Sequence, residues 1–500
     1  MNWVRPSAVI FILGTFVAGC GNGNVTLSID PTDTIVKRGL TQQFTANEDQ
    51  VTWSVDGGSS NGAINGNGLY TAPNALPANP TVTVRATKGQ EAATATVHLV
   101  TSDTLVFSTE PTLVSQDPDH RMDDEGTIGP GAQDRLALAQ NGARVDATWG
   151  AFADVYFNQQ LNSAGFGSDQ TVTDLGTALA LGVEEDQDGN PVLLFNSSPF
   201  SNGRVQVMTS PDGGANFGAP VTVFPSAPGD FQFQASLAVD EQNVFHVVLE
   251  NGPNSGVGLS AIDGTLFYSK SEDGGVTWSA NPLAIVTPEG PDDILQTPHL
   301  QIDSQGNIYV CYSVDPDGGA DPNGETFDLF LAKSADGGAS FVSTNLTPGS
   351  TTDKQFCRLS LGPDGEINIS YNSGILSETD VLFQRSVDGG ASFSSPITVN
   401  SDTAGRQGQA FLSTDIAGRI AAVWAADTDQ NELPDTLMYS QSLDGGKTFA
   451  PNLEIAGGPP ADFTAPMGLR HDLAGRLHVL FASNPDNPGF AADVYYLKGE

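Results

Sequence analysis

Apolar and polar residues alternate in short runs along most of the chain after residue 25, and Gly, Pro, Asn or Asp residues separate the runs. Alternation with a period of two is typical of β-strands that bury one face. In the first part of the chain the runs lie at 25–30, 41–46, 51–56, 62–73, 81–89 and 91–100. This spacing predicts a small β-sandwich over residues 25–100.

The rest of the chain, residues 101–500, repeats one larger unit. Each unit begins with a predicted hairpin of two strands around a polar turn, and the hairpins lie at 135–149, 178–195, 236–249, 299–312, 358–371, 411–424 and 469–481. A third strand follows, and in five units it leads into the turn Ser-x-Asp-Gly-Gly-x-x-aromatic, with its aspartate at Asp212, Asp273, Asp336, Asp388 and Asp444. Asp accepts hydrogen bonds from turn amides, and Gly adopts the positive φ angles that a tight hairpin needs.

The last unit ends with a third strand at 493–496, and no fourth strand follows it. We expect residues 104–107 to supply that strand, because pairing the two ends of the repeat closes a ring and removes its exposed edges.

Composition agrees with an all-β protein. The 500 residues include 56 Gly and 31 Pro, and 39% are hydrophobic, which suits short strands and tight turns around a sizeable core. Lys and Arg number 20 against 59 Asp and Glu, so the net charge is −39 at pH 7. Most of such a surface repels nucleic acid, which excludes nucleic-acid binding as a function.

Residues 1–19 have the layout of a secretory signal peptide: an early Arg5, an apolar run over 8–17, and small residues after it. The run is too short to span a bilayer. The sequence Val-Ala-Gly-Cys at 17–20 resembles the lipobox of bacterial lipoproteins. That resemblance implies cleavage before Cys20, lipidation of Cys20, and anchoring of the exported protein to the outer membrane or cell surface through the tether 20–24. An ordinary signal peptide with an incidental cysteine is the alternative.

Two further resemblances concern the predicted domains. In the sandwich, Trp53 followed by the segments 62–64, 68–70 and 72–73 resembles bacterial immunoglobulin-like domains of surface proteins, which implies a stalk. The Ser-x-Asp-Gly-Gly turn resembles the Asp-box, or BNR repeat, of sialidase-like β-propellers, where it is structural. We therefore predict an all-β chain in which an immunoglobulin-like domain, 25–100, precedes a sialidase-like β-propeller, 101–500. The repeat predicts seven blades, and six, the number in sialidases, is the alternative.

Three basic side chains fall at the predicted starts of first strands: Arg135, His299 and Arg358. Equivalent positions in different blades would bring them near the mouth of the central channel. Because the chain has few cations, this placement favours an anion-binding pocket. Pairing of each with a nearby carboxylate is the alternative.

The sialidase resemblance implies roles for some of these residues. Sialidases hold the sugar carboxylate with three arginines and use a tyrosine nucleophile that a glutamate activates. Arg135 and Arg358 are candidates for the clamp, and Tyr371 and Glu250 for the nucleophile and its base. The segment 133–137 has the arginine of the sialidase motif but lacks its aromatic residue and proline. Candidates for a third arginine, which no motif supports, are Arg406 and Arg470.

Two other features leave alternatives open. Cys311 and Cys357 can pair in an oxidising compartment, or they can be buried free thiols. The acidic loop that contains Asp315, Asp317, Asp321 and Asn323 offers oxygen ligands on alternate residues, which suits Ca²⁺, or it can be a solvated loop. We expect that no cofactor is required.

Together these observations favour a surface lipoprotein, anchored to a membrane through its lipid, whose propeller binds an extracellular glycan or protein. No catalytic motif is complete. The alternative is an exo-α-sialidase or a related glycoside hydrolase that clamps the substrate carboxylate with arginines.

Overall fold

The structure of the protein is a computed structural model. It describes residues 26–117, 134–139, 144–150, 154–161, 165–198, 203–225, 229–253, 264–287, 294–315, 327–375, 378–428, 434–457, 463–484 and 492–500, and structural statements below refer to these. The predicted signal peptide, Cys20 and the tether 20–24 lie outside the described residues. The described residues contain no helix that is long and apolar enough to cross a lipid bilayer.

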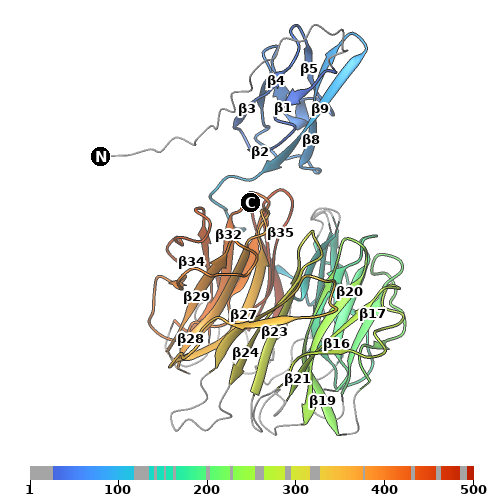
Figure 1. Cartoon of the computed structure of the whole chain (residues 1–500), viewed down its shortest axis with the longest axis vertical. Coiled ribbons are helices and arrows are strands. Elements are labelled where there is room, and N and C mark those ends of the chain that lie inside the picture. The colour runs from blue at the N-terminus through green and yellow to red at the C-terminus, as the bar shows by residue number, and fades with distance from the viewer. Residues whose placement is uncertain are drawn as a thin grey trace.

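Residues 26–100 form a β-sandwich with a core of its own (Figure 1). Its buried members, such as Phe44, Tyr70 and Val97, all come from the segment between Leu27 and Leu99. One sheet has the order β2 (Asp33–Lys37), β9 (Glu91–Val100), β8 (Thr81–Lys88), β5 (Thr52–Val55); another has the order β3 (Thr41–Gln43), β7 (Leu69–Thr71), β6 (Ala63–Ile64); and β1 (Ile29–Asp30) pairs with β4 (Thr45–Ala46). A short 3₁₀ turn, Gly58–Asn61, follows β5.

The described residues after 111 form seven four-stranded antiparallel sheets, here called blades 1 to 7. Blades 1 to 3 are β11 (Leu136–Ala139), β12 (Arg144–Trp149), β13 (Tyr156–Leu161), β14 (Gln170–Thr171); β15 (Leu179–Glu185), β16 (Pro191–Asn196), β17 (Val205–Thr209), β18 (Val221–Thr222); and β19 (Asp230–Val239), β20 (Phe245–Pro253), β21 (Thr265–Ser271), β22 (Leu283–Val286).

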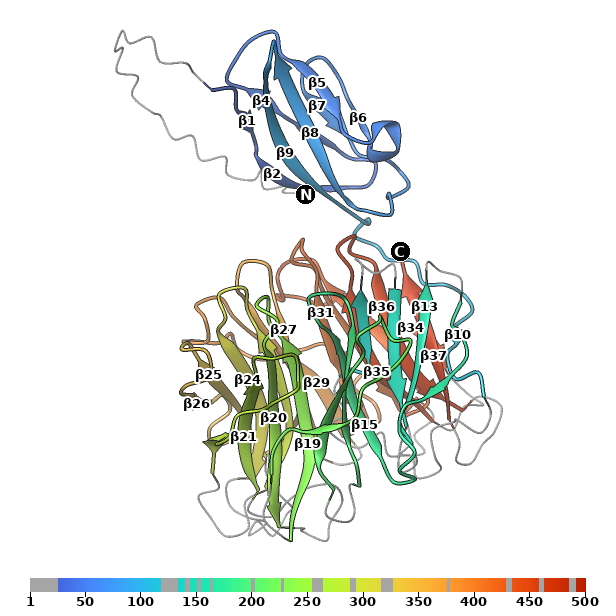
Figure 2. The same ribbon diagram turned by 90° about the vertical axis from the view of Figure 1, so that its right-hand side faces the viewer.

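Blades 4 to 7 are β23 (Ile294–Ile302), β24 (Ile308–Asp315), β25 (Asp328–Ser334), β26 (Val342–Asn345); β27 (Asp353–Leu361), β28 (Ile367–Ile375), β29 (Glu378–Ser386), β30 (Ile397–Thr398); β31 (Phe411–Thr414), β32 (Ile420–Ala426), β33 (Thr436–Ser442), β34 (Leu453–Gly457); and β35 (Thr464–His471), β36 (Leu477–Ser483), β37 (Asp493–Gly499), β10 (Thr112–Leu113). The first strands contact one another in order round the ring, including β35 with β11. The arrangement is a β-propeller (Figures 1 and 2).

Blade 7 closes the ring with an outer strand from the start of the domain. Thr112 pairs with Tyr496, and Leu113 pairs with Tyr495. The predicted strand at 104–107 pairs in part: Val106 and Glu500 exchange two backbone hydrogen bonds of 3.0 Å, and Phe107 forms a bridge with Gly499. Pro111 interrupts the pairing because it has no amide hydrogen to donate to a ladder, so the strand itself begins at Thr112.

Each Asp-box satisfies its own polar groups. In blade 3, Ser271 Oγ donates to Asp273 Oδ1 at 2.8 Å and accepts from the Gly275 amide at 2.9 Å, while the Thr277 amide donates to Asp273 Oδ1 at 2.8 Å. The aspartates that accept equivalent bonds in the other boxes are Asp212, Asp336, Asp388 and Asp444. The box aromatic packs against the preceding blade, as Phe341 does on Tyr268 at 5.2 Å between ring centres. These turns therefore connect neighbouring blades.

The two ends of the propeller differ in their connections. The chain runs antiparallel through each blade, so the Asp-box turns and the turns between first and second strands lie at one end. We call this the Asp-box end. The other end, called the opposite end, carries the starts of the first strands and the links from second to third strands. Figures 1 and 2 show the N-terminal domain (blue) beside one end of the propeller only.

The first strands of blades 4 and 5 begin earlier than the alternating pattern predicts. The sequence predicts strands from His299 and Arg358, but β23 begins at Ile294 and β27 at Asp353. In both strands the register shifts immediately before these residues, because a bulge places two residues opposite one. A bulge interrupts the period of two and conceals the first half of the strand. His299 and Arg358 therefore lie inside their strands and not at the channel mouth.

Candidate functional site

Four charged or basic side chains from different blades meet near the centre of the ring. Arg470, on β35, pairs with Asp134, which lies just before β11, and its Nη2 donates to Glu184 Oε1 on β15 at 2.6 Å. His299 Nε2, on β23, lies 3.9 Å from Asp134 Oδ2. This central cluster joins blades 1, 2, 4 and 7. Because Glu184 and Arg470 stand one residue before the ends of their strands, the cluster lies toward the Asp-box end of the channel.

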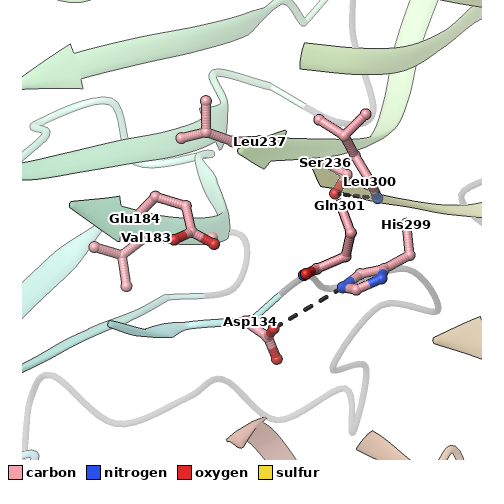
Figure 3. A pocket seen from close by; sticks show the side chains of 9 residues that line it. Asp134, Val183, Glu184, Ser236, Leu237, His299, Leu300 and Gln301 are labelled. Atoms are coloured by element: carbon pink, nitrogen blue, oxygen red, sulfur yellow. Dashed lines mark hydrogen bonds and ion pairs between the residues drawn. The ribbon is translucent and has the colours of Figure 1, made fainter. Parts of the chain in front are cut away.

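A small cavity opens beside the central cluster (Figure 3). Its lining residues are Asp134, Gly182, Val183, Glu184, Ser236, Leu237, His299, Leu300 and Gln301. The cavity has a volume of about 10 Å³ open to a water molecule's centre, which is room for about one water molecule. A sugar ring does not fit in this space, so the cavity by itself is not a carbohydrate site.

Burial and ion pairing set the protonation states in the central cluster. Burial alone would raise the pKa of Asp134, but Arg470, His299 and Arg358 lower it to about 2. Burial lowers the pKa of His299 to about 4. At neutral pH the cluster therefore contains an ionised Asp134 and an uncharged His299.

The cavity brings together Ser236, His299 and Asp134, the residue types of a nucleophile, a base and an acid. His299 Nδ1 accepts the Leu359 amide at 3.0 Å, and its Nε2 faces Asp134. Ser236 Oγ accepts the Leu300 amide at 3.0 Å (Figure 3). Because Nδ1 already accepts the Leu359 amide, the proton of the uncharged ring is on Nε2. His299 therefore has no nitrogen left to accept the Ser236 proton, and the trio does not have the geometry of a catalytic triad.

The two candidate clamp arginines have different surroundings. Arg135 is fully buried, and its three guanidinium nitrogens have no hydrogen-bond partner among the described residues. Burial lowers its pKa to about 10. Arg358 lies over the Phe411 ring at 4.6 Å, donates to the Cys357 carbonyl at 3.2 Å, and donates from both Nη atoms to the Gln409 amide oxygen at 3.0 Å. Arg358 is thus held by its own and the next blade.

The structure does not bring together the candidates for nucleophile and base. Tyr371 is on β28 in blade 5 and Glu250 on β20 in blade 3, so blade 4 separates them. The Tyr371 hydroxyl donates to Gln384 Oε1 at 2.9 Å inside the core, and burial raises its pKa above the usual range. A buried phenol with a raised pKa is a poor nucleophile. The sequence pattern does not show which side chains of different blades meet, so it leaves this pair open.

Cys311 and Cys357 form a disulfide between β24 and β27, so it links blades 4 and 5. Of the suggested Ca²⁺ ligands, Asp315 ends β24 and is buried, whereas Asp317, Asp321 and Asn323 lie outside the described residues. Among the described residues, no group of three or more His, Cys, Asp or Glu side chains could hold a metal ion.

Sequence reasoning missed two members of the central cluster, Asp134 and Glu184. It named Arg470 as a clamp candidate, but Arg470 is paired with both carboxylates. One signal is present: Glu184 and Glu185 end an otherwise apolar first strand, and Asp134 directly precedes the predicted start of another. An acidic residue on an innermost strand requires a cation nearby.

No protein-family model matches the chain, and no curated protein matches it. Solved structures do match. A polysaccharide lyase of the PL25 family, an ulvan lyase, aligns with a TM-score of 0.56 and 14% identity, covering 75% of this chain and 94% of the lyase. An ulvan lyase of this family bound to -[GlcA(1-4)Rha3S]- aligns with a TM-score of 0.55 and 13% identity, covering 75% and 94%. At this identity the likeness shows a shared fold.

The α-L-arabinofuranosidase Arb93A from Fusarium graminearum, in complex with an iminosugar inhibitor, aligns with a TM-score of 0.46 and 14% identity. That alignment covers 63% of this chain and 91% of the arabinofuranosidase.

Proposed function

We propose that the propeller binds an extracellular carbohydrate at its opposite end and does not cleave it. The carrying observation is the separation of Tyr371 from Glu250 by a whole blade, with the Tyr371 hydroxyl already bound to Gln384. A carbohydrate ligand is supported by the solved structures of similar fold that act on or bind glycans; because one of them is bound to -[GlcA(1-4)Rha3S]-, they support the type of ligand and not its charge.

The central cluster supports placing the ligand at the opposite end. It lies toward the Asp-box end of the channel, and its cavity holds about one water molecule. The Asp-box turns satisfy their own hydrogen bonds, so they offer few free polar groups to a sugar. The links from second to third strands, at the opposite end, differ in length from blade to blade, and such loops are how propellers acquire binding surfaces.

The net charge of −39 narrows the class of carbohydrate. A chain with this excess of carboxylates repels a polyanionic polysaccharide at long range, and counterions screen the repulsion only in part. We therefore propose a neutral glycan and expect uronate-containing or sulfated polymers to bind more weakly.

A glycan array followed by calorimetry tests this proposal. The decisive variants carry one added cysteine, in a Cys20→Ser background, to which a polyethylene glycol chain is attached: Thr352→Cys at the opposite end and Val387→Cys in an exposed Asp-box turn. We expect polymer at residue 352 to abolish binding and polymer at residue 387 to leave it intact. The reverse result, or binding of sulfated polymers alone, would refute the proposed surface or the proposed ligand class.

A second candidate function is sialidase-type hydrolysis, and one observation favours it. The buried Arg135 guanidinium, with no partner among the described residues, is what a carboxylate clamp without its substrate would present. Turnover of a fluorogenic sialoside that Arg135→Ala abolishes would establish this function. Absence of turnover in the unmodified protein would reject it.

We propose further that the chain is exported and lipid-anchored through Cys20. The disulfide between Cys311 and Cys357 supports an oxidising compartment. Cys20→Ser should move the protein from the membrane fraction to the soluble fraction of cells that express it. Unchanged membrane association would contradict the anchor.

A further inference from the structure

Residues 101–103, which connect the N-terminal domain to the propeller, are bound on the propeller side. The Thr101 amide donates to the Ala474 carbonyl at 2.8 Å, and Thr101 Oγ1 donates to the Gly475 carbonyl at 3.0 Å. Ala474 and Gly475 belong to the turn between β35 and β36 in blade 7, at the Asp-box end. Thr101 is only 1% exposed. This connection is therefore part of the propeller surface.

Arg419 holds the same segment from the adjacent blade. It lies in the turn between β31 and β32 of blade 6, where its Nε donates to Asp415 Oδ2 at 2.6 Å. Its Nη1 donates to the Ser102 carbonyl at 2.6 Å, and its Nη2 donates to Thr101 Oγ1 at 3.1 Å. A planar guanidinium that makes several bonds at once fixes direction as well as distance.

The equivalent turn of blade 7 provides an internal comparison. There Arg476 Nε donates to Asp472 Oδ2 at 2.5 Å, as Arg419 does to Asp415. Among the described residues, Arg476 makes no hydrogen bond to residues 101–103. Blades 6 and 7 thus share the local ion pair, whereas the contacts with the connection are made by Arg419 and not by Arg476 among the described residues.

The N-terminal domain holds the connection from the other side. Lys37 Nζ lies 2.6 Å from Asp103 Oδ1, and Arg38 Nη2 donates to Ser102 Oγ at 3.3 Å. The Asp103 carbonyl accepts Gln441 Nε2 of blade 6 at 2.8 Å. Each residue of the connection, 101–103, therefore makes at least one hydrogen bond or ion pair with one of the two domains. The connection also contains no glycine, so it lacks the composition of a freely rotating Gly-rich linker.

We propose that residues 101–103 form a fixed joint that holds the N-terminal domain at the Asp-box end of the propeller. Domains joined by short polar contacts usually move relative to each other, so the fixed direction depends on the bonds of Arg419, Lys37 and Gln441. The joint fixes the orientation of the N-terminal domain relative to the propeller. It turns the opposite end of the propeller away from the N-terminal domain and from any surface to which that domain is attached.

Distance measurements between two spin labels test the joint. One label goes on the N-terminal domain at Glu91→Cys, the other on the propeller at Val387→Cys, in the full chain with Cys20→Ser. We expect one narrow distance distribution for this protein and for its Arg476→Ala variant. Arg419→Ala should broaden the distribution about twofold or more, toward that of a short flexible linker.

Two results would overturn the proposal: a distribution that is already broad before substitution, or equal broadening by Arg419→Ala and Arg476→Ala. If Arg419→Ala fails to fold, Lys37→Ala replaces it, because that side chain is partly exposed and outside the propeller core. A narrow distribution in Lys37→Ala would then count against the joint. The measurement contains no ligand, so its failure would leave the proposed glycan binding to its own test.

Discussion

The Asp-box turns and the bulged first strands of the same blades satisfy their polar groups in opposite ways. In a box, bonds within a few residues satisfy both the serine hydroxyl and the aspartate, as in Ser334 and Asp336. At the bulges, Gln234 Nε2 and Thr297 Oγ1 are buried and have no hydrogen-bond partner among the described residues, and Thr297 has a φ of 53°. The Asp-box turns are regular and have satisfied polar groups, whereas the bulged strands contain a strained backbone angle and buried polar atoms without partners. Such features are most often found at functional sites.

The Asp-boxes and the central cluster also differ in whether their contacts are local or long-range in sequence. A box can form from its own eight residues, but the central cluster exists only when the ring is closed. Arg470 and its partner Asp134 are 336 residues apart, and Arg470 and Glu184 are 286 apart. Substitutions at the two places should therefore differ in size.

The largest effect is expected for Arg470→Ala. It leaves the carboxylates of Asp134 and Glu184 without their shared cation, and breaking a buried ion pair costs about 3–5 kcal/mol. Urea unfolding measures the loss. The triple variant Arg470→Met, Asp134→Asn, Glu184→Gln removes all three charges and should lose less than Arg470→Ala. An equal loss would show that packing and not charge dominates the centre.

The next largest effect on the free energy of unfolding is expected for alanine substitution of one of two neighbouring glycines in the blade 4 box. Gly338 has a φ of +84°, and a Cβ there would lie 2.3 Å from the Tyr268 ring of the preceding blade, whereas a Cβ on Gly337, with a φ of +68°, meets nothing within 4 Å. Both alanine variants pay about 1–2 kcal/mol for a left-handed backbone. Gly338→Ala should lose about 1–3 kcal/mol more, because of the clash. Equal unfolding free energies would show that the box does not hold the blades together.

A smaller effect concerns pH. Arg144 contacts Asp146 at 2.8 Å and Glu185 at 2.6 Å, and burial, with the neighbouring Asp146, raises the pKa of Glu185 above its usual 4.5. A raised pKa means that the folded state binds an extra proton, so this stability is complete below pH 4.5 and declines as pH rises.

The Glu185→Gln variant tests whether this contribution to stability declines as pH rises. Its amide can still donate to Asp146, so its stability relative to the unmodified protein should rise by about 1 kcal/mol between pH 5 and pH 8. Urea unfolding at both pH values measures this. A relative stability that falls with pH would mean that Glu185 is ionised in the folded protein.

The smallest effect is expected within a box. Ser334 Oγ is buried and both donates to Asp336 and accepts from the Gly338 amide, so Ser334→Ala should cost about 1 kcal/mol. Ser340 is exposed, and its hydroxyl makes one hydrogen bond, to Asp336 Oδ2 at 2.6 Å. The Ser340 amide also donates to Asp336, but that bond remains in an alanine variant. Ser340→Ala should therefore cost less than Ser334→Ala in the same unfolding measurement. The reverse order would contradict the central role of the buried serine.

Much of the fold could be predicted from residues that are close in sequence. The second strands overlap their predicted runs, as β12 does, which ends at Trp149 like the predicted hairpin 135–149, and the box turns form as expected. The first halves of β23 and β27 were missed because a two-residue bulge removes the alternation on which strand prediction depends. The predicted closing strand at 104–107 pairs with the end of β37 through Val106 and Phe107, and the pairing resumes at Thr112–Leu113, after Pro111, a break that alternation alone does not show.

The candidate site was harder to predict than the fold. Equivalent positions predict that Arg135, His299 and Arg358 lie together, and His299 and Arg358 do both lower the pKa of Asp134 at the centre. Their other contacts depend on register, which decides which neighbouring blade a side chain faces. Arg358 rests on Phe411 and Gln409 of the next blade, and His299 accepts the Leu359 amide of the next blade. Register depends on the bulges, which the sequence pattern does not reveal.

The sequence by itself determined the all-β character, the repeated unit and the conformation of each Asp-box, because these depend on side chains that bond within a few residues of their own position. Only the tertiary structure decided that Asp134, Glu184, His299 and Arg470 meet, and that Arg419 binds the connection at Thr101. Those contacts join distant segments, and their energy appears only after ring closure has brought the charges together and removed water from between them.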